Sequence, residues 1–124
     1  MELIILEEYM KHFRKLTSEE KKLIDLLIIK SNYNLKEKNW ADNLLVKSMN
    51  DGQMGSLYLC DESLISDKRF FGKMISEHLF LDVDGVNVIA SLNIDKDGNL
   101  FELDIWKTDY SPLIKYPDNY DLIP

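Results

Sequence analysis

The chain has 124 residues, of which 45% are hydrophobic and 30% are charged, and its formal net charge is −7. These values are typical of one globular domain over residues 1–124 with a substantial core, and the acidic balance argues against nucleic acid as a direct ligand. No apolar run reaches the roughly 18 residues that a membrane-spanning helix needs, and the single cysteine, Cys60, excludes a disulfide framework. We therefore expect a cytoplasmic protein that does not enter the membrane.

The N-terminal residues 2–15 can form a first helix, because Leu6, Met10 and Phe13 recur at helical spacing. Residues 3–6 could instead form a short edge strand. Acidic residues flank this apolar run, whereas a secretory signal needs a basic segment followed by a longer apolar one. We expect no secretory signal here.

A second helix is predicted from Thr17-Ser18-Glu19-Glu20, which is typical of a capping box. The Thr17 hydroxyl would cap the first turn, while the Glu20 carboxylate would accept a hydrogen bond from the Thr17 amide. The helix should run to Lys30 or Ser31. Leucine and isoleucine cover more than half of its circumference, so the helix must be largely buried against a sheet.

A β-hairpin is predicted around Asp51-Gly52, with strands over residues 44–50 and 53–60. Alternation directs four apolar side chains of this hairpin to the core: Leu44, Val46, Leu57 and Leu59. Gly55 within the second strand indicates a bulge or a close backbone approach. Residues 61–72 form a connection with room for a helical turn, and we expect Phe70 and Phe71 to anchor it to the core.

Three more antiparallel strands are predicted between residues 73 and 107, joined by a two-residue turn at Asp84-Gly85 and a loop at residues 95–98. Alternation gives them an apolar face, formed by Leu79, Leu81, Val86, Val88, Ala90, Leu92, Phe101, Leu103 and Ile105. The opposite, polar face carries Ser76, His78, Phe80, Asn87, Ile89, Ser91, Asn93, Glu102, Asp104 and Trp106. This register places His78 opposite Ser91, and Ser91 opposite Glu102.

The fold class that follows from these elements is α+β. We expect a single, mainly antiparallel sheet of about five strands, made of the hairpin and the three-stranded meander. One or two N-terminal helices pack on its apolar face. The pattern leaves open which face the first helix covers.

The polar face is the candidate functional surface. Tryptophan and tyrosine are favoured at protein-binding hot spots, and acidic residues beside them suit a basic partner surface. The candidate partner-binding residues are Glu102, Asp104, Trp106, His78, Ser91, Asp109 and Tyr110. The alternative is that Trp106 packs under the C-terminal tail or the N-terminal helix.

A hydrolytic site on the same face is a second hypothesis. His78, Ser91 and Glu102 could act as base, nucleophile and orienting carboxylate, but neither a glycine-rich elbow nor an oxyanion hole accompanies Ser91. The sequence therefore predicts no catalytic residues.

The sequence lacks the ligand patterns of common metal and phosphate sites. His78, Glu102 and Asp104 could offer metal ligands, but structural zinc prefers several cysteine and histidine ligands, and the only other histidine is His12. Four turn aspartates lack the EF-hand spacing for calcium: Asp82, Asp84, Asp95 and Asp97. Residues 51–56 lack the Lys-Ser/Thr of a P-loop. We predict no metal and no cofactor.

Two blocks of the chain resemble a family of small, uncharacterised bacterial proteins. Residues 51–56 (DGQMGS) resemble its DGGMGS hairpin, with Gln53 where the family usually has glycine, and residues 101–113 resemble its FELDIWK-x-DFSPL block. The resemblance covers residues 14–117, includes an opening similar to residues 15–20, and leaves residues 1–13 as an extension. It implies no activity, because the family has no assigned function.

The leading functional hypothesis is a non-enzymatic protein-binding module. Size and charge suggest a bacterial immunity protein that neutralises a basic toxin domain by occluding its active site. One alternative is a small-ligand-binding or hydrolytic enzyme that uses the polar face. Another is a structural subunit whose polar face is buried in a homodimer. The sequence does not determine the oligomeric state.

Overall fold

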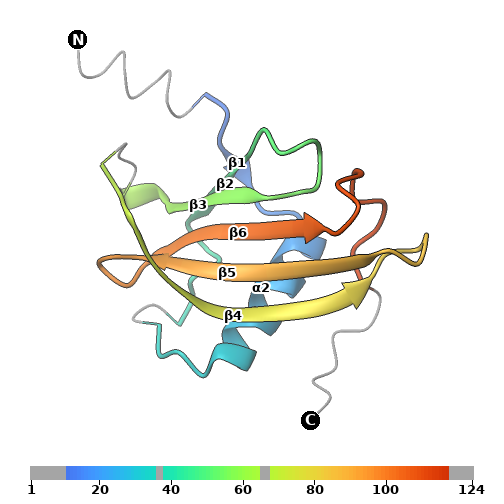
Figure 1. The fold of residues 1–124 in the computed structure, drawn as a ribbon. Coiled ribbons are helices and arrows are strands. Elements are labelled where there is room, and N and C mark those ends of the chain that lie inside the picture. The colour runs from blue at the N-terminus through green and yellow to red at the C-terminus, as the bar shows by residue number, and fades with distance from the viewer. Residues whose placement is uncertain (1–10, 36–37, 65–67, 118–124) are drawn as a thin grey trace.

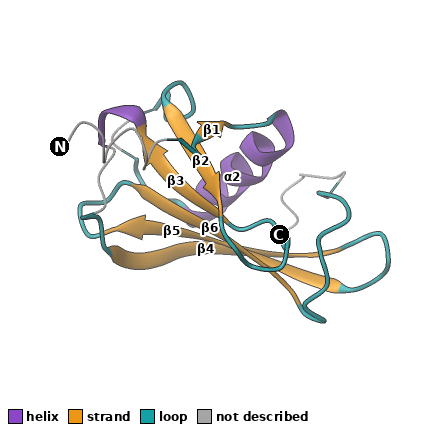
Figure 2. Cartoon of the chain, turned by 90° about the horizontal axis from the view of Figure 1, so that it is seen from above, coloured by secondary structure: helices purple, strands orange, loops and turns teal. Residues whose placement is uncertain are grey.

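The computed structural model describes residues 11–35, 38–64 and 68–117, in which one α-helix lies against one face of an open six-stranded sheet (Figures 1 and 2). The elements in chain order are β1 (Arg14–Lys15), α2 (Ser18–Ser31), β2 (Leu44–Ser48), β3 (Leu57–Asp61), a 3₁₀ turn (Glu62–Leu64), β4 (Phe71–Leu81), β5 (Asn87–Asp95) and β6 (Leu100–Lys107). The strands lie in the order β1-β2-β3-β6-β5-β4, and every neighbouring pair is antiparallel. The α+β class is confirmed, with six strands where about five were expected.

The additional strand is β1, at a place where the sequence predicted the end of a first helix. Arg14 pairs with Val46 and Lys15 pairs with Leu45. The apolar periodicity predicted a helix at these two residues, but they form a strand because their backbone pairs with β2. Most of the helix predicted over residues 2–15, and the alternative edge strand over residues 3–6, lie outside the described residues.

Helix α2 begins and ends where its sequence signals predict. Glu20 N donates to Thr17 Oγ1 at 3.2 Å, and Thr17 N donates to Glu20 Oε1 at 2.9 Å, which completes the capping box. Arg14 adds two hydrogen bonds of 2.8 Å to the Glu20 carboxylate, and so ties β1 to the helix start. At the other end, Asn32 adopts a left-handed conformation with φ 55° that stops the helix.

The core lies between α2 and the facing side of the sheet. The helix contributes Leu23, Ile24, Leu26 and Leu27, and the strands contribute Leu44, Val46, Leu57, Leu59, Phe80, Val88, Ala90, Leu92, Ile94, Leu103 and Ile105. The four hairpin side chains that were predicted to face the core do so. Phe70 and Phe71 do not, because both are exposed at the start of β4.

The turn between β4 and β5 contains three residues rather than the predicted two. Asp82 N donates to Val86 O at 3.0 Å, and Gly85 N donates to Asp82 O at 2.9 Å. Gly85 has φ 81°, as expected for the glycine that ends a three-residue hairpin loop. The pairing of the two strands is therefore shifted by one residue from the predicted register.

This one-residue shift turns the side chains of residues 76–81 of β4 to the opposite face of the sheet. His78 lies opposite Ala90 instead of Ser91, on the core side, and Phe80 is buried there. Leu79 and Leu81, which were predicted to lie in the core, are instead exposed on the other face.

The faces of β5 and of residues 102–106 of β6 agree with the prediction, because two register changes together shift the pairing by two residues, and a shift of two keeps each side chain on its face. Phe101, which was predicted to face the core, is only half-buried and is not part of the core. The loop after Asp95 also has three residues, and Phe101 is an extra residue of β6 that forms a bulge. Ser91 consequently pairs with Asp104 rather than Glu102, two residues further along the same face.

The β2–β3 connection is a wider loop than the predicted turn at Asp51-Gly52. Strand β2 ends at Ser48, and β3 begins at Leu57. Gly55 thus lies outside the strand, and a Cβ added there would lie 3.4 Å from Ile105 Cδ1. The expected close approach at this glycine is confirmed.

Candidate protein-binding face

One face of the sheet carries α2, and no helix or strand among the described residues covers the other (Figure 2). We call this second surface the open face. It is formed by side chains of five strands: Lys47, Tyr58, Glu102, Asp104, Trp106, Ile89, Ser91, Asn93, Glu77, Leu79 and Leu81.

The centre of the open face is acidic. Asn93 lies under two carboxylates, and its Nδ2 donates to Asp104 Oδ2 at 2.8 Å and to Glu102 Oε1 at 3.4 Å. Burial and the neighbouring Asp104 charge raise the pKa of Glu102, an effect that the Asn93 hydrogen bond partly offsets. Two carboxylates thus share one amide donor, and the Asp104 charge adds to the cost of ionising Glu102.

Within the described part of the chain, no lysine or arginine forms an ion pair with Glu102, Asp104 or Glu77. The strand register places Asp104 beside Ser91 and Ser91 beside Glu77, so the acidic groups extend in a row across β6, β5 and β4. The carboxylates of the open face therefore have no ion-pair partner among residues 11–35, 38–64 and 68–117.

An apolar row runs parallel to the acidic one. Trp106 pairs with Ile89, which pairs with Leu79, and the exposed fractions of Trp106 and Leu79 are 43% and 61%. Tyr110, in the turn after β6, lies beside Trp106 with ring centroids 6.2 Å apart. Exposed tryptophan and tyrosine are residue types in which protein-binding surfaces are enriched.

The structure brings together most of the residues that the sequence singled out. Glu102, Asp104, Trp106 and Ser91 share the open face, and Tyr110 lies at its rim. Asp109 lies in the same turn, but its Oδ1 accepts hydrogen bonds from Ser111 N at 3.0 Å and Ser111 Oγ at 2.6 Å. These hydrogen bonds lower the pKa of Asp109. They also show that one oxygen of its carboxylate stabilises the turn.

His78 is the exception, and its placement on the polar face was wrong. Its Nδ1 lies 3.3 Å from Lys30 Nζ of α2, and its ring stacks on Phe80 with centroids 6.3 Å apart. Burial, followed by the Lys30 charge, lowers the pKa of His78. Because His78 and Ser91 point to opposite faces, the base and nucleophile of the hydrolytic hypothesis are not brought together.

Sequence reasoning missed Glu77, Leu79 and Tyr58 as members of the open face. The position of Tyr58 could have been predicted, because alternation correctly directed Leu57 and Leu59, on either side of it, toward the core. Glu77 and Leu79 depend on the length of the β4–β5 turn, and Asp84-Gly85 suits a two-residue and a three-residue loop equally well.

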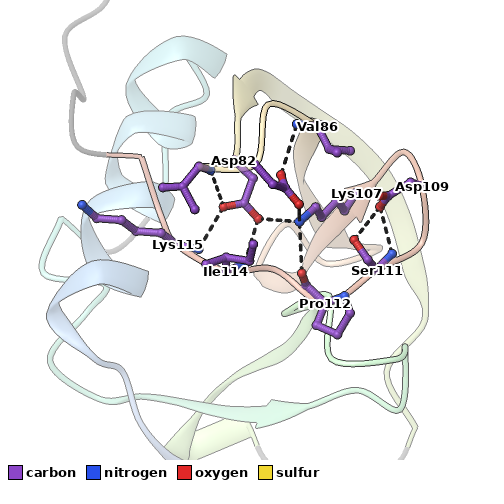
Figure 3. A network of polar contacts seen from close by, with 10 residues as sticks. Asp82, Val86, Lys107, Asp109, Ser111, Pro112, Ile114 and Lys115 are labelled. Carbon is purple, nitrogen blue, oxygen red and sulfur yellow. Dashed lines mark hydrogen bonds and ion pairs between the residues drawn. The ribbon is translucent and has the colours of Figure 1, made fainter.

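The second missed feature is a buried ion-pair network at the end of β6 (Figure 3). Lys107 Nζ donates to Asp82 Oδ2 at 2.9 Å, to Asp84 Oδ2 at 2.6 Å and to Pro112 O at 3.2 Å. These three acceptors satisfy all three donors of the ammonium group. Burial alone would lower the pKa of Lys107, but the two carboxylates raise it, so the lysine stays charged.

Asp82 joins this network to the segment that follows β6. Its Oδ2 also accepts from Ile114 N at 2.8 Å, and its Oδ1 accepts from Val83 N at 2.7 Å and Lys115 N at 3.1 Å. Burial raises the pKa of Asp82, but the hydrogen bonds from Ile114 N, Lys107 and the other two amides outweigh burial and bring it to about 2. The network holds residues 108–115, and hence Tyr110, next to the open face.

Two of the alternative sites considered from sequence find no support in the geometry. No three His, Cys, Asp or Glu side chains of the described ranges converge as metal ligands would. In the loop over residues 51–56, Asp51 Oδ2 accepts from Ser56 N at 2.9 Å, and Ser56 Oγ bonds Ile105 N at 2.8 Å. These polar groups fasten the loop to β6.

No described helix has the length and hydropathy to cross a bilayer.

The fold and this surface together define a small α+β domain with one covered and one open sheet face. The chain belongs to a family described as a domain of unknown function (DUF6984), whose model matches residues 13–117. No curated protein and no solved structure gave a significant match. The resemblance to a family without assigned function is therefore confirmed at the level of the family.

Proposed function

We propose that the chain is a non-enzymatic protein-binding module whose open face binds a basic protein surface. The observation that carries this proposal is the pair of carboxylates at the centre of the face. Glu102 and Asp104 share Asn93 as a donor and have no cationic partner within the described residues. A lysine or arginine of a partner would relieve their mutual repulsion as it binds.

The aromatic rim gives this surface its apolar contact area. Trp106 and Tyr110 would cover the stem of a basic side chain while its charge meets Glu102 or Asp104. Within this class we propose an immunity protein, which neutralises a toxin domain with a basic active site by occluding it. The net charge of −7 would also accelerate association with such a partner at low salt.

Charge reversal with a matched control tests the proposal. The full chain is immobilised and exposed to extract of its native host, and bound proteins are quantified by mass spectrometry. The double variant Glu102→Lys with Asp104→Lys should lose the partner by at least about tenfold, because two attractive contacts become repulsive. The variant Asp25→Lys with Asp97→Lys changes the net charge equally at exposed sites elsewhere and should retain it.

Equal retention by both double variants would contradict binding through the open face. Equal loss from both would show that net charge, rather than this face, determines capture, and would contradict it as well. A partner whose binding region carries no excess of lysine and arginine would contradict the proposed chemistry.

A further inference from the structure

Strand β4 forms one edge of the sheet and, among the described strands, pairs only with β5 (Figure 1). Bulges between Phe71 and Lys73 and between Met74 and Ser76 interrupt the first half of its pairing with β5. The last part, residues 76–81, is regular. Only this part of the edge offers evenly spaced backbone groups to a further strand.

The outward-facing groups follow from the turn geometry. The Asp82–Val86 hydrogen bond marks a hydrogen-bonded pair, and such pairs alternate along an antiparallel ladder. Phe80 and His78 therefore bond to β5. Glu77, Leu79 and Leu81 direct their N–H and C=O groups away from the sheet.

The side chains of these three residues all lie on the open face. Leu79 and Leu81 have exposed fractions of 61% and 64%, while Glu77 continues the acidic row that starts at Asp104. Natural edges are commonly protected by lysine, proline or a bulge, and residues 76–81 contain none of these. This stretch is therefore open to pairing with another strand.

We propose that β4 binds an extended segment of the basic partner as an additional antiparallel strand. The segment would place apolar side chains opposite Leu81 and Leu79 and a lysine or arginine opposite Glu77. Read from its N-terminus, it has the pattern apolar-x-apolar-x-basic. This inference rests on the proposed function and adds the chemistry of the partner segment to it.

A second copy of this chain fits the same edge less well. A two-fold axis at Phe80 would pair Leu79 with Leu81 of the other copy but leave Glu77 opposite Val83. An axis at Leu79 would place Glu77 opposite Leu81, and an axis at Glu77 would place two carboxylates opposite each other, so none of these arrangements gives Glu77 a basic partner. Each copy also carries a net charge of −7. Complementarity at Glu77 instead requires a basic residue from a different chain.

The probes are two fluorescein-labelled synthetic peptides with alternating side chains, identical except for lysine or glutamate at the position opposite Glu77. Fluorescence anisotropy with the full chain should show that the lysine peptide binds about two- to fivefold more tightly. Glu77→Lys should reverse this preference, and hydrogen exchange should slow at the amides of Glu77, Leu79 and Leu81. Lack of binding, equal binding of both peptides, or unchanged exchange at these amides would overturn the inference.

Binding of the captured partner to two sets of variants distinguishes this inference from the proposed function. Leu79→Lys with Leu81→Lys changes two exposed side chains and should reduce partner binding at least about fivefold with an unchanged unfolding midpoint. If only Glu102→Lys with Asp104→Lys weakens binding, strand addition is wrong and the open face still binds. If only the edge variant weakens binding, strand addition stands without the face. Sedimentation that reveals self-association, lost in Leu79→Lys, would make a second copy the occupant and overturn the inference.

Discussion

Lys107 Nζ lies 2.9 Å from Asp82 Oδ2, and the side chains of both residues are completely shielded from solvent. The pair joins the last residue of β6 to the residue that directly follows β4, before the three-residue turn. Two further hydrogen bonds to Asp82, from Ile114 N and Lys115 N, hold the chain after β6 in place. The position of the aromatic rim of the open face thus depends on a network remote from its acidic centre.

Removing the Asp82 carboxylate should strongly destabilise the fold. Asp82→Ala leaves the Lys107 ammonium with one carboxylate and leaves the amides of Ile114 and Lys115 without their acceptor. Breaking a buried ion pair in this way costs about 3 kcal/mol or more. Urea unfolding followed by circular dichroism measures the loss as a lower transition midpoint.

The matched control is Asp25→Ala, an exposed position of α2 at which alanine is a good helix former. Its unfolding free energy should change by less than about 0.5 kcal/mol. Equal effects of the two substitutions would show that the buried network is not a special source of stability.

The pKa of Asp82 predicts a specific loss of stability in acid. The folded pKa of about 2 lies below the ordinary value of 3.8, so the unfolded chain takes up a proton first as the pH falls. The stabilisation is complete above the ordinary value and disappears as the pH falls through about 2. Unfolding midpoints measured from about pH 5 downward should decrease, and Asp82→Asn should show a shallower decrease. Parallel curves for the two proteins would contradict the assignment.

Backbone strain in the β2–β3 loop predicts a stabilising substitution. Gln53 has φ 65°, a conformation that costs a non-glycine residue about 1 kcal/mol. Gln53→Gly should therefore raise the unfolding free energy by about 0.5 kcal/mol after the larger entropy of the unfolded glycine chain is counted. Gly55→Ala should have the opposite effect, because Gly55 has φ 105° and a Cβ there would lie 3.4 Å from Ile105 Cδ1. Thermal melts that rank the two variants the other way would refute this account of the loop.

The acidic centre should cost stability in the free protein. Burial and the Asp104 charge raise the pKa of Glu102, so ionised Glu102 disfavours the folded state above that pKa, and the penalty is relieved as the pH falls through it. Glu102→Gln should raise stability at neutral pH by about 0.5 kcal/mol, and this gain should fade as the pH falls through the raised pKa toward the ordinary value of 4.5. The same substitution should weaken partner binding. A variant that is less stable at neutral pH would show that Glu102 has a structural role.

Local signals predicted those parts of the fold that depend on neighbouring residues. The capping box at Thr17 correctly predicted the start of α2, and alternation correctly oriented β5, residues 102–106 of β6 and the hairpin side chains. The orientation of β4 failed because it depends on whether one turn has two or three residues, which Asp84-Gly85 does not distinguish. This error changed the composition of the candidate site. His78 was predicted to lie on the open face but does not, whereas Glu77 and Leu79 lie on that face although they were predicted on the other.

The buried network was beyond sequence reasoning for a different reason. Asp82 and Lys107 are 25 positions apart, and each alone is typical of an exposed turn or strand end. Only the tertiary arrangement of β4, β6 and the following chain brings them together. By contrast, Glu102, Asp104 and Trp106 could be assigned to one face because alternate residues of a single strand share a face.

Fluorine NMR of the chain labelled with fluorotryptophan tests most directly whether the open face binds the partner. The chain has two tryptophans: Trp106 lies on the open face, and Trp40 packs against the core on the other side of the sheet. Addition of the unlabelled captured partner should shift or broaden the Trp106 resonance and leave the Trp40 resonance unchanged. A shift of Trp40 with an unchanged Trp106 resonance would contradict binding through the open face.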